Sequence, residues 1–410
     1  MRRVVVTGMG AVTPLGHSVS ETFDGLKEGR SGIGPITRFN AEEFSCRIAA
    51  EVKDFDISPL LSAKESRRMD IFIHYALHAA KEAFDDSALE LGELDLERFG
   101  TVIGSGIGGL PMIESQHENF LKNGPRRISP FFIPSLIINL ASGHVSIKYG
   151  LKGPNSAVVT ACATGSHAIG DAFKLIQSDR ADFMIAGGTE SVVCALAVGG
   201  FASMRALSTR NDDPESASRP FDVDRDGFVL GEGCGLVILE EYEHARKRGA
   251  KIYGEVLGYG MSGDAYHITA PAEDGSGAMR VIKNALNDAG IQKERIDLIN
   301  AHGTSTPAGD RIETQAIRNV FGDHTDKMMV HSSKSMLGHL LGAAGSVESI
   351  VALKTLETGI VHATANVDNL DPDCKIDPVA GDAREIPVKT VLSSSFGFGG
   401  TNSVLIFGKV

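Results

Sequence analysis

The stretch Val158-Val159-Thr160-Ala161-Cys162-Ala163-Thr164-Gly165-Ser166-His167-Ala168-Ile169-Gly170 decides the fold. It begins with β-branched residues and changes at Cys162 to small residues, which predicts a buried strand, a sharp turn and a helix. Cys162 falls at the junction, where the free N–H groups and the dipole of the helix favour a thiolate. A nucleophile elbow with Cys in place of Ser needs this geometry. A small buried cysteine without chemistry is the alternative, since free Cys is usually buried.

The composition indicates a large, glycine-rich α/β protein. A chain of 410 residues with 47 glycines and no tryptophan predicts two domains or one duplicated domain. The net charge of −12 argues against a nucleic-acid partner. The five cysteines include no C-x-x-C pair, which disfavours a disulfide framework or structural zinc and favours a reducing compartment. Without a leader segment or a bilayer-length apolar run, we expect a cytoplasmic protein that does not enter a membrane.

Strands and helices alternate in the same plan along both halves of the chain. The first half, residues 1–250, predicts strands at 3–7, 100–104 and 181–188, a hairpin at 228–240, and helices at 19–29, 62–88, 111–122, 134–148, from Cys162 to about 178, and at 241–248. The second half, 251–410, predicts strands at 252–262, 297–301, 329–332, 390–396 and 402–408, and helices at 275–289, 309–321 and 343–358. The repeated plan predicts duplicated α/β halves with mixed sheets.

Two motifs imitate ligand-binding loops. Gly104-Ser105-Gly106-Ile107-Gly108-Gly109 follows a strand and fits the dinucleotide pattern G-x-G-x-x-G. The acidic residue expected at the end of a second strand is absent, so a tight turn is the preferred interpretation. Asp222–Gly227 resembles the start of an EF-hand, but Gly233 stands where the bidentate Glu belongs, so calcium is disfavoured.

Three stretches of the second half supply groups that a reactive cysteine could use. They are Asn300–Asp310 with His302, Ser333–Gly345 with Lys334 and His339, and the glycine-rich Ser395–Asn402 with Phe398. A cysteine at a helix N-terminus together with two histidines and a lysine indicates catalysis. Zinc held by the cysteine and both histidines is the alternative. It is disfavoured because the ligands lie far apart in sequence and zinc would blunt the nucleophile.

These motifs resemble the β-ketoacyl-acyl carrier protein synthases, the Cys-His-His branch of the thiolase fold. The matching segments are Thr160-Ala161-Cys162, Asn300–Thr304, Lys334–His339 and Gly397–Asn402, and the resemblance covers essentially the whole chain. The loop 124–132 and the run 206–212 resemble the synthase II type of bacterial fatty-acid synthesis. Leu337, Ala163-Thr164 and Ser394 depart from the usual residues without removing a catalytic group. They could alter an ion site near Glu348 that some members have.

The resemblance implies an α-β-α-β-α layered thiolase fold and an elongating condensing enzyme. Cys162 would accept an acyl group, and the backbone N–H groups of Cys162 and Phe398 would hold the oxyanion. His302 and His339 would donate hydrogen bonds to the enolate formed when malonyl-carrier protein loses CO2. Lys334 would organise the histidine loop through Glu313, with Asp310 in support. Decarboxylation drives carbon–carbon bond formation, so no cofactor is required.

The resemblance also implies contacts with substrates and partners. Substrate contacts are predicted for Ile107, Phe131, Phe132, Ile133, Phe201, Thr269, Thr304 and Thr306. Acidic acyl carrier protein is expected to meet the basic residues Lys64, Arg67, Arg68, Arg126, Arg127 and Arg205. A homodimer whose Val158–Thr160 segments meet is expected. The alternatives are a thiolase, which usually has a second catalytic Cys near the C-terminus, a non-catalytic chain-length factor, and a dehydrogenase using the Gly104 motif.

Overall fold

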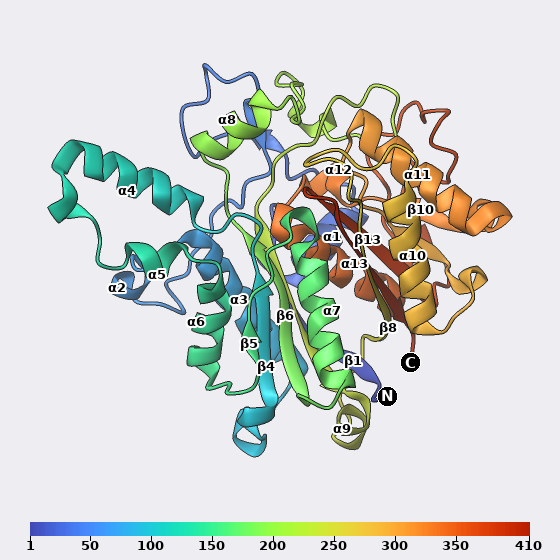
Figure 1. The fold of residues 1–410 in the computed structure, drawn as a ribbon, viewed down its shortest axis with the longest axis horizontal. Coiled ribbons are helices and arrows are strands. Elements are labelled where there is room, and N and C mark those ends of the chain that lie inside the picture. The colour runs from blue at the N-terminus through green and yellow to red at the C-terminus, as the bar shows by residue number, and fades with distance from the viewer.

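The computed structural model describes residues 1–410 and is built on one ten-stranded sheet (Figure 1). Its order is β10-β9-β13-β14-β8-β1-β7-β6-β4-β5. The strands are β1 Val4–Val12, β4 Phe99–Gly104, β5 Asn155–Ser156, β6 Phe183–Glu190, β7 Gly233–Glu241, β8 Gly254–Gly263, β9 Leu298–Asn300, β10 Met329–His331, β13 Thr390–Gly397 and β14 Thr401–Gly408. Two small ribbons pair β2 Gly34–Pro35 with β3 Ile48–Ala49, and β11 Ile360–Val361 with β12 Arg384–Glu385.

The large sheet consists of two five-stranded halves with the same topology. From β1 outward the first half runs β7, β6, β4, β5, and from β8 outward the second runs β14, β13, β9, β10. In each half the first two pairings are antiparallel and the last two are parallel. β1 and β8 join the halves through only two residue pairs, Val5 with Glu255 and Val6 with Gly254. The predicted duplication is therefore confirmed.

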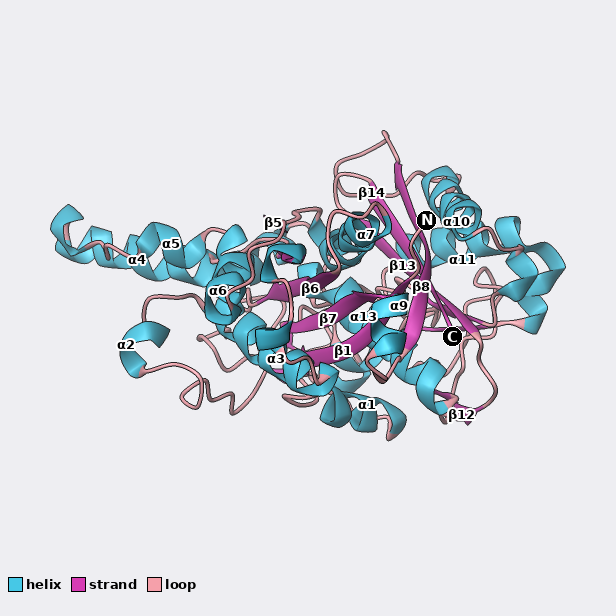
Figure 2. Ribbon diagram, turned by 90° about the horizontal axis from the view of Figure 1, so that it is seen from below, coloured by secondary structure: helices cyan, strands magenta, loops and turns pink.

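Helices form three layers around the two halves of the sheet (Figure 2). They are α1 Val19–Lys27, α2 Ala63–Ser66, α3 Ile71–Ser87, α4 Leu110–Asn123, α5 Phe132–Leu136, α6 Asn139–Tyr149, α7 Thr164–Gln177, α8 Ala195–Ser203, α9 Tyr242–Lys247, α10 Ser276–Ala289, α11 Pro307–Phe321, α12 Lys334–Leu337 and α13 Ala344–Thr358. α3 and α6 share a core with the first half, and α10 and α11 with the second. α7 and α13 lie between the halves, which gives the predicted α-β-α-β-α arrangement.

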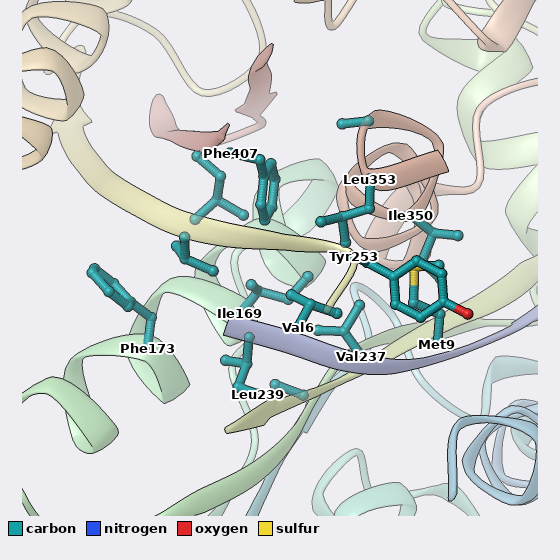
Figure 3. Close-up of a cluster of buried hydrophobic side chains, with 14 of the residues drawn as sticks. Val6, Met9, Ile169, Phe173, Val237, Leu239, Tyr253, Ile350, Leu353 and Phe407 are labelled. Atoms are coloured by element: carbon teal, nitrogen blue, oxygen red, sulfur yellow. The ribbon is translucent and has the colours of Figure 1, made fainter. Parts of the chain in front are cut away.

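The middle layer holds the largest core, a cluster of 30 buried residues drawn from both halves. Figure 3 shows Ile169 and Phe173 of α7 and Ile350 and Leu353 of α13 beside strand residues such as Val237. Burying each large apolar side chain contributes ~1.5–3 kcal/mol, so this layer binds the halves together.

Glycines let the two central helices approach the sheet closely. A Cβ at Gly170 of α7 would lie 2.3 Å from the Tyr259 ring of β8. A Cβ at Gly235 of β7 would lie 2.7 Å from the backbone N of Val347 of α13. Thus α7, from the first half of the chain, also packs on β8 of the second half, and α13, from the second half, also packs on β7 of the first half. This exchange brings the Cys162 turn, before α7, close to the start of α13.

Several predicted elements differ from the structure. The helix expected at 62–88 is two helices, because Ser62 and Asp70 each stand at an N-cap. The hairpin at 228–240 is wrong: only β7 forms, and residues near 230 bridge to other segments. The buried strand before Cys162 is also wrong, since β5 ends at Ser156 and Val159 is 54% exposed. None of the helices combines the length and apolar character needed to cross a bilayer.

Candidate active site

Cys162 lies in a strained turn that leads into α7. A 3-10 turn at Ala161–Ala163 precedes the helix, and Ala161 has a φ of 49°. Few residues other than glycine adopt this left-handed conformation, so the surrounding structure must hold it in place. Thr164 Oγ1 donates to Ala161 O at 2.8 Å and accepts from Thr160 N at 2.9 Å. The predicted elbow geometry is therefore present, with a turn of 3-10 helix in place of a strand.

One cavity of about 450 Å³ collects most of the predicted site residues. Its lining includes Ile107, Cys162, Phe201, Thr269, His302, Thr304, Thr306, Asp310, Glu313, His339 and Phe398. These residues come from both halves of the chain. A mostly apolar cavity with a few convergent polar groups has the character of a ligand site.

The ring of His339 is fixed in one tautomer by the backbone. Leu341 N donates to His339 Nδ1 at 3.3 Å, so Nδ1 is an acceptor and Nε2 carries the proton. Phe228 packs edge-on against this ring at 5.3 Å between ring centres. His339 N donates to Val229 O at 2.7 Å, and Gly231 N donates to His339 O at 2.9 Å. His339 therefore presents a held N–H donor.

His302 lies edge-on to His339, with 5.4 Å between ring centres. Glu313 Oε1 accepts from the backbone N of His302 at 2.8 Å, and Glu313 Oε2 accepts from Gly303 N at 2.8 Å. Ser394 Oγ donates to the same carboxylate at 2.7 Å. Burial and the positive charge of Lys334 lower the pKa of both His302 and His339 well below the usual value, so both rings are neutral at pH 7.

Lys334 pairs with Glu348, and the predicted pairing with Glu313 is wrong. Both side chains of the observed pair are 2% exposed. Glu313 is occupied by backbone N–H groups and Ser394, whereas Glu348 projects from α13 toward the start of α12. Asp310 also acts elsewhere than expected: it accepts from Phe221 N at 2.9 Å and so holds the 219–226 loop.

Two buried oxygens beside this ion pair have no hydrogen-bond partner, Glu348 Oε2 and Asn300 Oδ1. The two residues are adjacent, because Asn300 Nδ2 donates to the Glu348 carbonyl at 3.0 Å. Carboxylate and amide oxygens are ligands that suit a hard cation. No cluster of three His, Cys, Asp or Glu side chains has the spacing of a metal site.

The thiol of Cys162 is 8% exposed, and burial raises its pKa to about 12. The charge of Lys334 and backbone hydrogen bonds from Phe398 and Cys162 oppose this rise. Burial therefore acts against the effect that the helix N-terminus is expected to have on the thiol. The same two N–H groups converge on the sulfur, where a developing oxyanion would also lie.

Phe131, Phe132 and Ile133 do not line the cavity of their own chain, contrary to the prediction. They lie where α5 begins, on an arm that α4 and α5 extend away from the body (Figure 2). Ile133 is 57% exposed, and Phe131 lies under the guanidinium of Arg68 at 4.2 Å. Sequence alone does not distinguish a projecting aromatic residue from one in a pocket.

The predicted basic residues occupy two places. Lys64, Arg67 and Arg68 of the α2 region lie at the same end of the molecule as Arg126 and Arg127, which follow α4 (Figures 1 and 2). Arg205 lies apart, between the cavity-lining residues Met204 and Ala206. None of the six forms an ion pair within the chain, so their charges are free for a partner.

Little in the sequence marks the residues that support the site. Glu190, Phe228 and Phe396 contact catalytic candidates or their loops, yet each falls inside an ordinary apolar or strand segment. The segment Asp222–Gly227, which resembles the start of an EF-hand, takes part in a network of polar contacts. Asp222 accepts from Arg219 Nε at 3.0 Å and from Asp224 N at 2.9 Å.

Comparisons with known proteins identify the family of the chain. Residues 1–245 match the family model "Beta-ketoacyl synthase, N-terminal domain", and residues 253–368 match the corresponding C-terminal domain. The chain is 54% identical over 409 residues to a 3-oxoacyl-[acyl-carrier-protein] synthase 2 of Coxiella burnetii, covering 100% of this chain and 99% of the relative. A relative with the same name in Synechocystis is 54% identical over 408 residues, covering 100% and 98%.

Two solved structures share the whole fold. A type II PKS ketosynthase, in complex with its acyl-carrier protein and bound to a hexaketide, matches with a TM-score of 0.93 and 37% identity, covering 100% of both chains. A beta-ketoacyl synthase of Burkholderia phymatum matches with a TM-score of 0.92 and 36% identity, again over 100% of both chains. The chain therefore belongs to the beta-ketoacyl synthase family.

Proposed function

We propose that the chain is an elongating condensing enzyme of type II fatty-acid synthesis. The observation that carries the proposal is the convergence of Cys162, His302, His339 and the Phe398 backbone on one cavity. The chain is 54% identical over its full length to two proteins named 3-oxoacyl-[acyl-carrier-protein] synthase 2. This similarity supports the proposal that the chain catalyses the same reaction. The absence of a second cysteine near Phe398 disfavours a thiolase, and the presence of Cys162 disfavours a non-catalytic chain-length factor.

In the first stage, Cys162 sulfur attacks the thioester carbonyl of acyl-carrier protein. The proton of the Cys162 thiol passes to the pantetheine sulfur, which departs as a thiol when the carbon–sulfur bond breaks, and the acyl group remains on Cys162. The N–H groups of Cys162 and Phe398 hold the oxyanion of the tetrahedral intermediate. Removing one such donor typically costs ~3–4 kcal/mol of transition-state stabilisation.

In the second stage, malonyl-carrier protein loses CO2 and its electron pair forms an enolate. Nε2 of His339, which carries a proton, donates to the enolate oxygen, and neutral His302 supplies a second donor from the same cavity. The enolate carbon attacks the acyl-Cys162 carbonyl and the thiolate leaves, giving a β-ketoacyl product longer by two carbons. These steps require no redox cofactor.

The substrate is delivered by an acidic carrier protein that docks on the free basic residues. Thr304 and Thr306, whose hydroxyls lie 3.0 Å apart, face the cavity and can bind the pantetheine amides. Thr269 and Phe201 complete the lining for the acyl chain. We assign residues 1–250 to the half that carries the nucleophile and 251–410 to the half that carries both histidines. The protein works in the cytoplasm.

A homodimer is part of the proposal. β5 is an edge strand with both residues exposed, and Val159 just after it is 54% exposed. An exposed strand edge and apolar side chains such as Ile133 on the α4–α5 arm are suited to a second copy of the chain. Sedimentation of the wild type against a Val159→Glu variant tests this: the variant should be monomeric, and an unchanged dimer would exclude this interface.

Intact-mass spectrometry after exposure to acyl-carrier proteins tests the reaction. The wild type should gain one acyl group on Cys162, and Cys162→Ala should gain none while keeping its fold. Addition of malonyl-carrier protein should then discharge the acyl enzyme and release CO2. A Cys162→Ala variant that still condenses at the wild-type rate would refute the proposal.

A further inference from the structure

Glu190 is a completely buried carboxylate without a basic partner. It ends β6, is 0% exposed and forms no ion pair. Five neutral donors satisfy it instead: Ser105 Oγ at 2.6 Å, Gly106 N at 2.7 Å, Gly342 N at 3.0 Å, Ile107 N at 3.2 Å and Gly108 N at 3.3 Å. Four of the five are backbone N–H groups, so the carboxylate holds the main chain of residues 106–108 and of Gly342 in place.

The glycine-rich turn 104–109 therefore wraps around an internal anion. Successive backbone N–H groups in a turn form a concave binding place for an anion, which phosphate fills in dinucleotide-binding proteins. Here Glu190 fills it. The resemblance of this turn to G-x-G-x-x-G thus reflects a need for convergent N–H groups.

Two backbone segments that form the cavity, the turn 105–108 and the turn at Gly342, bind this carboxylate, and the Cys162 turn lies against the first of them. A Cβ at Gly106 would lie 2.7 Å from Glu190 Oε2 and 3.3 Å from Ala161 O in the Cys162 turn. A Cβ at Gly342 would lie 2.3 Å from Gly106 N and 2.8 Å from the same carboxylate oxygen. Gly342 follows Leu341, whose N–H sets the tautomer of His339. No side chain larger than hydrogen fits between these segments.

We propose that Glu190 is a positioning residue that holds the Ile107 wall of the cavity against the Cys162 turn and the Gly342 turn, and thereby sets which acyl chains reach Cys162. The proposal rests on the proposed acyl transfer to Cys162. Its contribution is geometric, because the carboxylate contacts backbone donors and not the cavity. Both oxygens are needed: Glu190→Gln would place an amide NH2 against N–H donors, and Glu190→Asp would withdraw both oxygens by one methylene.

Self-acylation rates with octanoyl- and palmitoyl-carrier proteins test the proposal in wild type, Glu190→Gln, Glu190→Asp and Glu82→Gln. Glu82 is the control, because it is a half-buried carboxylate that also accepts from two backbone N–H groups, those of Ala11 and Val19, both at 2.8 Å, and lies outside the lining of the Cys162 cavity. Both Glu190 variants should change the palmitoyl-to-octanoyl ratio at least threefold, and Glu82→Gln should leave it unchanged. Ratios within twofold of the wild type in both Glu190 variants would overturn the proposal.

Glu190 could affect Cys162 through its position or through its negative charge. Alkylation of Cys162 by iodoacetamide, followed by peptide mass mapping, distinguishes these two effects. Removing a negative charge near a thiol favours its thiolate, so Glu190→Gln should react about fivefold faster at fixed pH below the thiol pKa. Glu190→Asp keeps the charge and should react at the wild-type rate while its selectivity still changes. If the change in selectivity appeared only together with faster alkylation, the positioning role would be wrong. Alkylation needs no carrier protein, and a wild type that takes no acyl group would contradict the proposed function instead.

Discussion

The ammonium group of Lys334 forms its ion pair with Glu348 of α13, with both side chains 2% exposed. The pair links the loop of His339 to the central helix layer. Breaking a buried pair by removing one partner leaves an unpaired charge and costs about 3–5 kcal/mol, more than exchange of both partners for apolar residues. We therefore expect Lys334→Met alone to lose about that much unfolding free energy, and Lys334→Met with Glu348→Leu to lose less. Urea denaturation measures both, and equal losses would contradict the pairing.

Substitutions of His302 or His339 should affect a different stage of the reaction from substitutions of Cys162. His302→Ala and His339→Ala are expected to retain most acyl transfer to Cys162. They should lose about 10²–10³-fold in malonyl decarboxylation, because each removes a donor to the enolate oxygen. Intact-mass acylation and CO2 release measure the two stages separately. His324→Ala is the control, since His324 Nε2 contacts Ile296 O at 2.9 Å and lies outside the cavity lining. Equal losses in both stages would contradict the assigned roles.

Cys162→Gln should lose condensation and decarboxylate malonyl-carrier protein faster than the wild type. Gln removes the nucleophile and places an amide where the acyl carbonyl would lie, while His302 and His339 remain. CO2 release in the absence of acyl-carrier protein is the measurement, with Cys162→Ala for comparison. An unchanged rate of CO2 release would count against the two-stage scheme.

The strained turn before Cys162 should tolerate only residues that accept a positive φ. Ala161 has a φ of 49°, and Ala88 has a φ of 50° at the end of α3, outside the cavity lining. A β-branched residue at such a position costs about 1–3 kcal/mol. Ala161→Val and Ala88→Val should therefore lose similar unfolding free energy, but only Ala161→Val should slow acylation of Cys162. Ala161→Gly should keep the wild-type stability within about 1 kcal/mol.

A pair of buried histidines in ring contact should make the fold sensitive to acid. The rings of His331 and His362 lie 4.1 Å apart, and the Nε2 atom of each has no partner. Burial lowers the pKa of His362 to about 4 and that of His331 well below its usual value. The unfolded chain therefore binds protons first as the pH falls below about 6.5, and stability is lost progressively toward pH 4.

Replacing both residues in a His331→Gln, His362→Gln variant should flatten the dependence of unfolding free energy on pH between about 6.5 and 4. Urea denaturation across this range compares the variant with the wild type. His324→Gln is a partly buried control that should retain the wild-type slope. A double variant with the full wild-type slope would contradict the assignment.

Much of the fold was predictable because its signals are local. Glycine and β-branched runs marked most strands of both halves, and the repeated order predicted the duplication. Errors arose where burial depends on distant neighbours: Val159 lies at an edge, and residues 228–230 pair with Leu207 and His339 instead of folding into a hairpin. Short apolar runs carry no information about which segment will cover them.

The sequence by itself determined the candidate chemical groups, Cys162, His302, His339 and the Phe398 loop, because each lies in a short motif with specific spacing. Only the tertiary structure decided how they are supported. The partner of Lys334, the filling of the glycine-rich turn by Glu190, and the exclusion of Phe131–Ile133 from the cavity depend on contacts between segments far apart in the chain. Burial, which raises the pKa of the Cys162 thiol against the helix dipole, is likewise a property of the packed molecule.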